Sequence, residues 1–356
     1  MTTLPLQRTT IRKLNLRSMV PFLTGGLAFL VGGVILSAAG EDPIYAYQIM
    51  LKGAFGSVRA LADTLVKTTS LLILGLAVAV AFKCKIWNIG AEGQLYFGAL
   101  GGLLVGLSFI GTLPILAPII VIITGFVFGA LFSMIPAVLK VRLGVNEVIV
   151  TVLLNFVALL FISYLLHGPL KAPGFLSYSP NIHLESELPV LLPNTRLSVG
   201  ILIAAASVIG VHILMSKTKI GFEIRSVGAN IKAARYVGMN ISKSIFVTMG
   251  ISGGLAGIGG AILVAGVQHR LIEGISPGYG FIAVIVALLG KQNPIGVTIV
   301  AFFFSALLAG SEVMYRTLGV PVALAQTLQA LVLVFVLIGE LSLRWEPKKE
   351  KETKDN

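Results

Sequence analysis

The chain has 356 residues, of which 56% are apolar and 12% are charged, and its mean hydropathy is +0.94. A soluble domain needs no apolar stretches of the length found here, whereas a helix that crosses the hydrocarbon core of a bilayer needs roughly 20 apolar residues. Residues 115–139 and 323–339 are apolar on all sides rather than at alternate positions, which excludes a transmembrane barrel. The composition therefore predicts an all-α, polytopic membrane protein.

The net charge of +12 does not indicate a nucleic-acid partner, because the Lys and Arg residues fall in the gaps between the apolar runs. Membrane topology explains such a distribution. The single cysteine, Cys84, excludes an intramolecular disulfide and a metal cluster built on cysteines. Basic residues precede the apolar run 19–39, as in a signal peptide, but no compelling cleavage pattern follows, and an uncleaved first helix is expected.

Ten membrane-spanning segments are expected in chain order. They cover approximately residues 19–39, 65–82, 87–110, 115–139, 146–167, 197–215, 244–267, 279–290, 294–315 and 321–341. The segment 279–290 is too short to cross alone and is expected to be tilted, broken or re-entrant. The connection 40–64 carries aromatic side chains among charges, which is typical of an amphipathic helix at the membrane interface.

The distribution of basic residues predicts the orientation of these spans. If the N-terminus is cytoplasmic, most of the 27 Lys and Arg residues fall on the cytoplasmic side. The positive-inside rule then predicts that both termini are cytoplasmic. The expected organisation is a cytoplasmic segment at 1–18, a transmembrane domain at 19–345 and a short charged cytoplasmic tail at 346–356.

Two loops are long enough to contact other proteins. The extracytoplasmic loop 168–196 contains five prolines, which disfavour a helix, and it is either a docking surface for an external partner or a passive connector. In the cytoplasmic loop 216–243, helix-forming residues at 229–237 lie between Gly228 and Gly238. This pattern predicts one short helix that another protein can grip.

Neither an ATP site nor a catalytic site is evident in the sequence. A phosphate-binding loop needs glycines followed by a Lys and a hydroxyl residue, and no segment has this arrangement. The four histidines lack metal-ligand spacing, and no Ser-His-Asp or paired-carboxylate set stands out. The chain is therefore not expected to be an enzyme, to bind a metal or cofactor, or to hydrolyse ATP by itself.

Polar residues interrupt the apolar sequence between 87 and 94, and they are Asn88, Glu92 and Gln94. An unpaired carboxylate in a span costs about 2.5 to 3.5 kcal/mol, so Glu92 is expected to face a partner or water. The segment is either a gate or substrate wall, or a helix start with Asn88 as N-cap and Glu92 near the positive end of the helix dipole.

A second polar set begins at Asn146 and continues with Glu147, Thr151 and Asn155. The last three are spaced four apart and therefore lie on one face of a helix. In apolar surroundings such a stripe either lines a path for a solute or bonds to a neighbouring helix, at about 0.6 kcal/mol per bond. The candidate translocation path combines both polar sets, and its residues are Asn88, Glu92, Gln94, Asn146, Glu147, Thr151 and Asn155.

Small residues at a spacing of four predict close packing of helices. The two sets are Gly98, Gly102 and Gly106, and Gly253 and Gly257 with Ala261 and Ala265 beyond them. Because small side chains let two backbones approach, these faces are expected to be structural rather than part of a transport path.

Three segments carry a resemblance to a known family. They are W-N-I-G-A-E-G-Q at 87–94, N-E-V-I-V-T-x-L-L-N at 146–155 and G-F-E-I-R-S-V-G-A-N-x-x-A-A-R-Y-V-G-M-N at 221–240. From about residue 65 onward, the chain resembles the permease subunits of bacterial ABC importers in the branched-chain amino acid, ribose and nucleoside group. The first segment and the long N-terminal region make it most similar to the larger permease of a nucleoside importer.

The resemblance implies partners and a location. Such a permease works in the bacterial cytoplasmic membrane with a cytoplasmic ATPase subunit, a second permease that is a paralogue or a copy, and an extracytoplasmic substrate-binding lipoprotein. ATP and Mg²⁺ are then bound by the ATPase, and the substrate is a nucleoside. The loop 216–243 becomes the coupling loop that docks on the ATPase, with contact candidates Glu223, Arg225, Asn230, Ala233, Ala234 and Gly238.

The alternative function is an ion-coupled secondary transporter of a small polar solute, in which Glu92 or Glu147 would bind the proton or sodium ion. No convincing internal repeat is evident, and the long loop 216–243 would have no purpose in such a transporter. The sequence therefore favours the ATP-driven importer.

Overall fold

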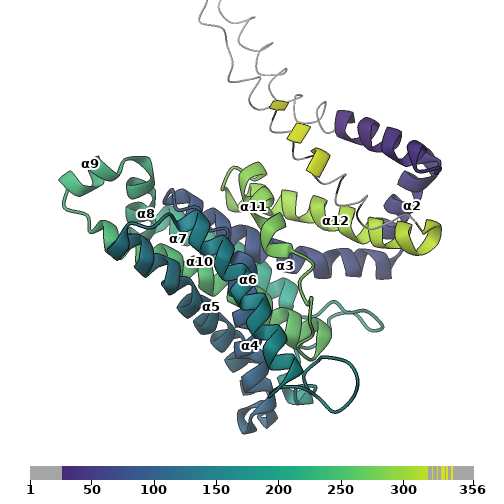
Figure 1. The fold of residues 1–356 in the computed structure, drawn as a ribbon, viewed down its shortest axis with the longest axis horizontal. Coiled ribbons are helices and arrows are strands. Elements are labelled where there is room, and N and C mark those ends of the chain that lie inside the picture. The colour runs from purple at the N-terminus through teal and green to yellow at the C-terminus, as the bar shows by residue number, and fades with distance from the viewer. Residues whose placement is uncertain are drawn as a thin grey trace, which may run out of the picture. The chain divides into compact units, whose positions relative to one another are not determined.

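The structure is a computed structural model that describes residues 26–319 and scattered positions between 323 and 339. The described residues form α-helices joined by turns and loops, with two isolated β-bridges and no strand among them (Figure 1). The all-α class predicted from the sequence is confirmed for this part of the chain. Two compact units can be distinguished: a larger unit of residues 54–309, and a smaller unit formed by the described residues of 1–53 and 310–356.

The larger unit holds most of the helices. In chain order these are α3 (Val58–Lys83), α4 (Ala91–Leu107), α5 (Leu116–Leu143), α6 (Glu147–His167), α7 (Gly200–Lys217), α8 (Lys219–Ala229), α9 (Ile231–Tyr236), α10 (Ile241–Leu263) and α11 (Tyr279–Leu289). Helix α12 (Pro294–Leu318) begins in this unit and ends in the other. A π-helix at Val264–Gln268 prolongs α10, and 3-10 turns occur at Phe109–Thr112 and Leu184–Ser186.

The ten spans expected from the sequence are not confirmed. Among the described residues, six helices are long and apolar enough to cross a bilayer, namely α3, α5, α6, α7, α10 with its π-helix, and α12. A seventh span results if the helix Gly26–Ala38 and α2 (Pro43–Phe55), which are bent by 115°, count as one. Helices α4 and α11 are shorter, at 17 and 11 residues, and the expected span 321–341 lies largely outside the described residues.

In the smaller unit, the helix Gly26–Ala38 turns sharply into α2 instead of continuing in one direction. Asp42 stabilises the start of α2, because its Oδ1 accepts the Ile44 N–H at 2.9 Å. Tyr47 ties the two helices together: its O–H donates to the Phe29 carbonyl at 2.6 Å, and its ring meets the Phe29 ring edge to face. The segment 40–64 thus contains a helix, as expected, and this helix is bent by 115° from the one before it; its position at the membrane interface stays a prediction.

Helix α10 is the centre of the larger unit and lies against α3, α4 and α5. Glycines make these contacts close: a Cβ added at Gly98 would overlap the Gly257 backbone, and one added at Gly257 would overlap the Gly125 carbonyl oxygen. One turn further along, Gly102 meets Ala261. The close packing predicted from the spacing of small residues is confirmed at these positions.

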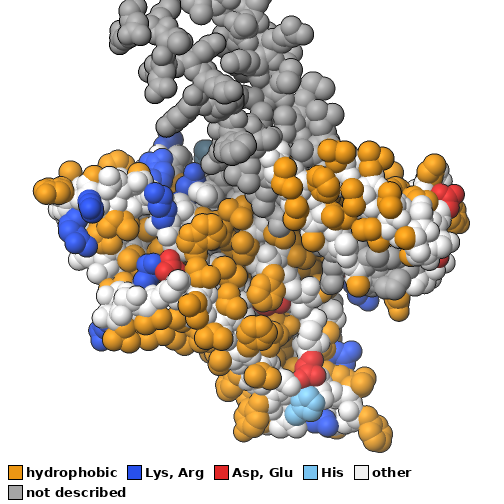
Figure 2. Space-filling model, turned by 45° about the horizontal axis from the view of Figure 1, so that its top comes forward, with side chains coloured by type: hydrophobic (Ala, Val, Ile, Leu, Met, Phe, Trp, Pro, Cys, Tyr) orange, Lys and Arg blue, Asp and Glu red, His pale blue; other side chains and the backbone are white. Residues whose placement is uncertain are grey.

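Helices α5, α6 and α7 present apolar side chains outward, and such side chains cover much of the larger unit's surface (Figure 2). In the most apolar stretch of α5, α6 and α7, only 28%, 22% and 22% of the residues are buried. The corresponding shares are 83% for α3 and 78% for α10 with its π-helix. An exposed apolar surface of this extent is unfavourable in water, whereas lipid chains or another membrane helix would cover it.

Basic side chains gather at one end of the larger unit, which we call the basic end (Figure 2). It contains the C-terminal ends of α3 and α5, with Lys83 and Lys140, and the helices α8 and α9. Helix α8 packs directly on α3 there, because a Cβ added at Gly228 would overlap the Lys83 carbonyl oxygen. The opposite end, which we call the loop end, carries the connection 168–199.

The connection 168–199 contains no α-helix, as its prolines predict, but it is not a free loop. The backbone N–H groups of Ser179, Ile182 and Leu188 donate to carbonyl oxygens within residues 265–271 at 2.8–2.9 Å. An isolated bridge joins Tyr178 to Ile272. The connection therefore lies over the end of α10.

The glycine contacts generate the first prediction. In Gly257→Ala the new Cβ must displace the α5 backbone, and such overpacking typically costs about 1–3 kcal/mol. Gly210 on α7 has no atom within 4 Å of its missing Cβ, so Gly210→Ala is expected to be neutral or to stabilise by up to about 1 kcal/mol. Apparent unfolding temperatures in detergent measure both. Equal effects of the two substitutions would contradict the close contact.

Candidate translocation and coupling sites

The chain is irregular between α3 and α4, over residues 84–90. In hydrocarbon the N–H groups of such a break must find acceptors outside the helix. Helix α6 supplies them: the Ile89 N–H bonds to Thr151 Oγ1 at 3.3 Å, and the Gly93 N–H to Asn155 Oδ1 at 2.8 Å. Asn155 Nδ2 in turn donates to the Ile89 carbonyl at 2.8 Å. The polar stripe of α6 therefore holds the start of α4.

Asn88 ties the same break to α10 and α3. Its Nδ2 donates to Gln94 Oε1 at 3.0 Å and to Ser252 Oγ at 2.9 Å, and Gln94 Nε2 donates back to Asn88 Oδ1 at 3.1 Å. Ser252 Oγ donates to the Ala77 carbonyl at 2.7 Å. The three polar side chains are at most 1% exposed, so their donors and acceptors are satisfied inside the protein.

Glu147 is a partnered charge near the basic end. Its carboxylate forms an ion pair with Lys140 at the end of α5, and its Oε1 accepts the Trp87 N–H at 3.4 Å. Helix α6 begins at this residue, and the exposed Asn146 caps it, because Asn146 Oδ1 accepts the Val148 N–H at 2.9 Å. Asn146 thus stabilises a helix end, while Glu147 joins α5, α6 and the break before α4.

Glu92 lies where two helices begin. It stands in the first turn of α4, is 2% exposed, and its Oε2 accepts the N–H of Gly280, in the first turn of α11, at 2.6 Å. The Ser276 hydroxyl and the Gly278 N–H bond to the same carboxylate. Because a helix N-terminus carries a partial positive charge, a carboxylate between two of them stabilises both.

The segment that leads into α11 runs antiparallel to the start of α4. The Tyr96 O–H donates to the Ser276 carbonyl at 3.4 Å, so the chain between Ser276 and Gly280 passes α4 antiparallel. With 11 residues, α11 is about 16 Å long, roughly half the thickness of a hydrocarbon core. Which of the three expected forms residues 279–290 take, tilted, broken or re-entrant, stays a prediction.

The structure brings six of the seven candidate path residues together around the break, and leaves the seventh, Asn146, exposed at the basic end. The six are at most 9% exposed, and they are Asn88, Glu92, Gln94, Glu147, Thr151 and Asn155. Each bonds to protein groups on another helix or on the break. Bonding between helices was one of the two interpretations of these polar residues from the sequence, and the structure contains such bonds. The other interpretation, contact with a solute, stays a prediction.

The prediction that Asn88 caps α4 is wrong. The N-cap is Gly90, whose N–H donates to Asn88 Oδ1 at 3.0 Å. Asn88 lies two residues earlier because its side chain bonds to Ser252 and Gln94 in the interior. Glu92 does lie in the first turn of α4, as the same hypothesis requires.

The loop 216–243 contains two helices, α8 and α9, where the sequence predicts one at 229–237. Thr218 begins α8, because its Oγ1 accepts the Gly221 N–H at 3.0 Å. The chain then breaks at Asn230, whose Oδ1 accepts the Ala233 N–H at 3.1 Å and caps α9. An Asn side chain that caps a new helix, rather than a glycine, separates the two.

The two glycines predicted to bracket the helix have different roles. Gly228 lies inside α8, where its lack of a side chain permits the contact with Lys83, so its predicted role as a boundary is wrong. Gly238 follows α9 at a φ of +81°, the left-handed region that glycine favours after a helix, as predicted.

The six contact candidates do not share one surface. Arg225, Asn230, Ala233 and Gly238 are exposed, Glu223 is partly buried, and Ala234 is only 2% exposed. Residues that the sequence did not single out are more prominent: Tyr236 is 93% exposed, Val237 72% and Ile231 46%. The sequence could have indicated these residues, because they are apolar and lie outside any expected span. Exposed apolar side chains at a polar end of a protein favour contact with a protein partner.

Comparison with known proteins identifies the class. Six or seven helices within the described residues are long and apolar enough to cross a bilayer, as in a multi-pass membrane protein. Residues 60–337 match the model of the family described as branched-chain amino acid transport system / permease component. The chain belongs to this family and is the permease component of an ABC transporter.

Relatives align over most of their length. The glucose ABC transporter permease protein TsgB13 of Haloferax volcanii is 37% identical and covers 91% of this chain and 88% of its own. The nucleoside permease NupB of Lactococcus lactis is 32% identical over 90% of both chains. The guanosine permease NupP of Bacillus subtilis is 33% identical over 89% of this chain and 92% of its own. A second permease from each of the last two organisms, NupC and NupQ, is 28% and 31% identical.

The α6 bonds generate the second prediction. Asn155→Ala leaves the Gly93 N–H and the Ile89 carbonyl without partners, at about 1–3 kcal/mol each. Asn146→Ala, the control on the same helix, removes only an exposed cap and should cost about 1 kcal/mol. Apparent unfolding temperatures should therefore fall further for Asn155→Ala. A variant of normal stability whose KM for solute is raised would instead place Asn155 on the solute path.

Proposed function

We propose that this permease imports nucleosides across the cytoplasmic membrane, driven by ATP that a separate subunit hydrolyses. The observation that supports it most is the exposed apolar and basic surface of α8 and α9 in a chain of this family. Four of the five relatives described above are named for nucleosides or guanosine, and one for glucose. A nucleoside is therefore the first substrate to test, and a sugar the second.

The proposed orientation places the basic end in the cytoplasm. Lys83 and Lys140 end α3 and α5 there, and Lys217 ends α7. The positive-inside rule assigns such helix ends to the cytoplasmic side. Both termini are proposed to be cytoplasmic as well, with the segments 1–18 and 346–356 on that side of the transmembrane domain 19–345.

In the proposed mechanism, α9 docks on the ATPase, which binds ATP and Mg²⁺. Tyr236 and Val237 would enter an apolar depression, while Arg225 sets orientation at the rim. Movement of α8 would be passed on through its contact with Lys83, since this residue directly precedes the irregular segment before α4. Asn230, between α8 and α9, and Gly238, after α9, would contribute by fixing where the two helices end.

The other partners follow from the exposed surfaces. The apolar faces of α5, α6 and α7 are proposed to meet lipid and a second permease, a paralogue or a copy. A paralogue is favoured because two permeases match in each of two bacteria. The ordered connection 168–199 at the loop end is proposed to receive the substrate-binding lipoprotein.

The buried carboxylates speak against the alternative of an ion-coupled transporter. Glu92 accepts bonds from the start of α11, and Glu147 pairs with Lys140. Both carboxylates are therefore bonded to protein groups in this conformation. Helix N-termini inside transporters commonly bind anionic groups of the solute, and here Glu92 already takes that place. A neutral solute such as a nucleoside or sugar fits this arrangement better than an anion.

Uptake measurements are the third prediction and test the function directly. Cells that express the complete transporter should accumulate labelled guanosine or uridine, and unlabelled nucleoside should compete while glucose does not. Uptake should stop when ATP is depleted and persist when an uncoupler removes the proton gradient at a maintained ATP level. Accumulation of glucose alone would refute the nucleoside, and uptake that fails with the uncoupler but survives ATP loss would refute the ATP-driven mechanism.

The fourth prediction concerns the coupling surface. Arg225→Glu should abolish co-purification of the ATPase while membrane insertion stays normal, because a reversed charge opposes the partner surface. Tyr236→Ala should weaken ATPase binding by about thirtyfold. Arg196→Glu, the matched charge reversal at the exposed loop end, should have no effect. Retained ATPase in both α8–α9 variants would reject the coupling assignment.

A further inference from the structure

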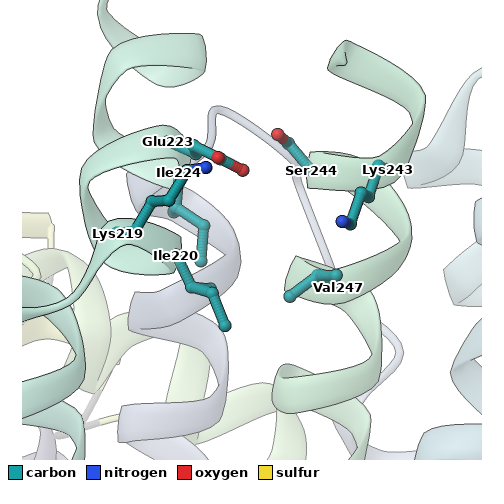
Figure 3. A pocket seen from close by; sticks show the side chains of 7 residues that line it. All are labelled: Lys219, Ile220, Glu223, Ile224, Lys243, Ser244 and Val247. Atoms are coloured by element: carbon teal, nitrogen blue, oxygen red, sulfur yellow. The ribbon is translucent and has the colours of Figure 1, made fainter. Parts of the chain in front are cut away.

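A cavity of about 120 Å³ lies between α8 and the first two turns of α10, at the basic end (Figure 3). Its lining residues come from these two helices and are Lys219, Ile220, Glu223, Ile224, Lys243, Ser244 and Val247. Figure 3 shows Lys243 extending from α10 into the space between the helices, and Lys219 extending along α8 toward Glu223. None of the contacts assigned above to the permease involves this cavity, apart from the expected role of Glu223.

The charges in the cavity favour an anion. Lys219 and Lys243 are both exposed, and within the described residues no carboxylate lies within ion-pair distance, 4.0 Å, of either ammonium group. Glu223 is the opposing charge in the lining and leaves the cavity with a net positive charge. The first turn of α10 adds the partial positive charge of a helix N-terminus.

The apolar part of the cavity favours a lipid as the source of that anion. Ile220, Ile224 and Val247 form the rest of the wall, so the ammonium groups stand beside aliphatic side chains. Helix α8 has buried and exposed faces typical of a helix that lies in the membrane interface. Lys219 and Lys243 each adjoin the end of an apolar helix, α7 and α10, which is where lipid headgroups lie.

We propose that this cavity binds the phosphate group of an anionic phospholipid in the leaflet that meets the basic end. Lys219 and Lys243 hold the phosphate from two sides, and Ile220 and Val247 contact the aliphatic part of the lipid. Basic pockets between helices at the cytoplasmic face are typical sites for such headgroups. A bound lipid bridges α8 and α10 and so sets the position of α8 beside the ATPase surface. The proposal depends on membrane insertion of α7 and α10, and not on which solute is carried.

The fifth prediction tests this site in the purified transporter complex, with bound lipid counted by native mass spectrometry during titration with phosphatidylglycerol or phosphatidylcholine. Replacing both lysines, Lys219→Gln with Lys243→Gln, should weaken phosphatidylglycerol binding by about thirtyfold and leave phosphatidylcholine binding unchanged. The matched control, Lys217→Gln with Lys85→Gln, removes two exposed lysines at the same end that do not line the cavity, and should bind lipid normally.

Further variants separate the site from general attraction and from misfolding. Glu223→Gln should strengthen phosphatidylglycerol binding by about fivefold, because it removes the opposing charge. Lys219→Arg with Lys243→Arg should restore binding, which shows that the fold is intact. The proposal is overturned if the control pair loses as much lipid as the cavity pair, or if inorganic phosphate displaces phosphatidylglycerol at equal concentration. Loss of the ATPase instead of lipid from the cavity variant would likewise reject it, since the surface would then belong to the protein partner.

Discussion

The interior of the larger unit depends on a carboxylate shared by two helix beginnings. Both α4 and α11 start inside the apolar part of the protein, where the exposed N–H groups and positive ends of two helices would be unfavourable without a counter-charge. Glu92 supplies it from the first turn of α4 and reaches the first turn of α11. An irregular segment precedes each of these helices, residues 84–90 before α4 and residues 269–278 before α11. Glu92, although a carboxylate is unfavourable in hydrocarbon, stabilises the helix start that follows each segment.

The remaining polar groups of the interior serve the same requirement. Thr151 and Asn155 of α6 bond to the backbone of the first irregular segment, and Ser252 of α10 reaches it through Asn88. Such segments occur at membrane depth only where protein surrounds them or water fills a cavity. Tight glycine contacts between α4, α5 and α10 hold the surrounding helices in place. The polar residues therefore stabilise an interior that is broken in two places and still contains few unpaired groups.

Features that depend on periodicity could be predicted from the sequence, and features that depend on distant backbone atoms could not. The i, i+4, i+8 spacing placed Glu147, Thr151 and Asn155 on one buried face, and the glycine spacing placed the close contacts. The partner of Glu92 could not be predicted from spacing, because Gly280 is 188 residues away in the chain. The bonding group is a backbone N–H, which every residue except proline has, so the residue type gives no indication either. Helix α8 was missed for another reason: its charged residues resemble a loop, although its apolar positions recur as in a helix.

The joint between α8 and α3 is made by main-chain atoms, since Gly228 meets the carbonyl of Lys83. This close approach does not involve the outward side chains of α8 and α9, so those residues can change without disturbing it. In the proposed coupling, exposed side chains such as Tyr236 could then be exchanged to suit a different ATPase. The contact itself requires a glycine at position 228, because a Cβ there would overlap the Lys83 carbonyl oxygen.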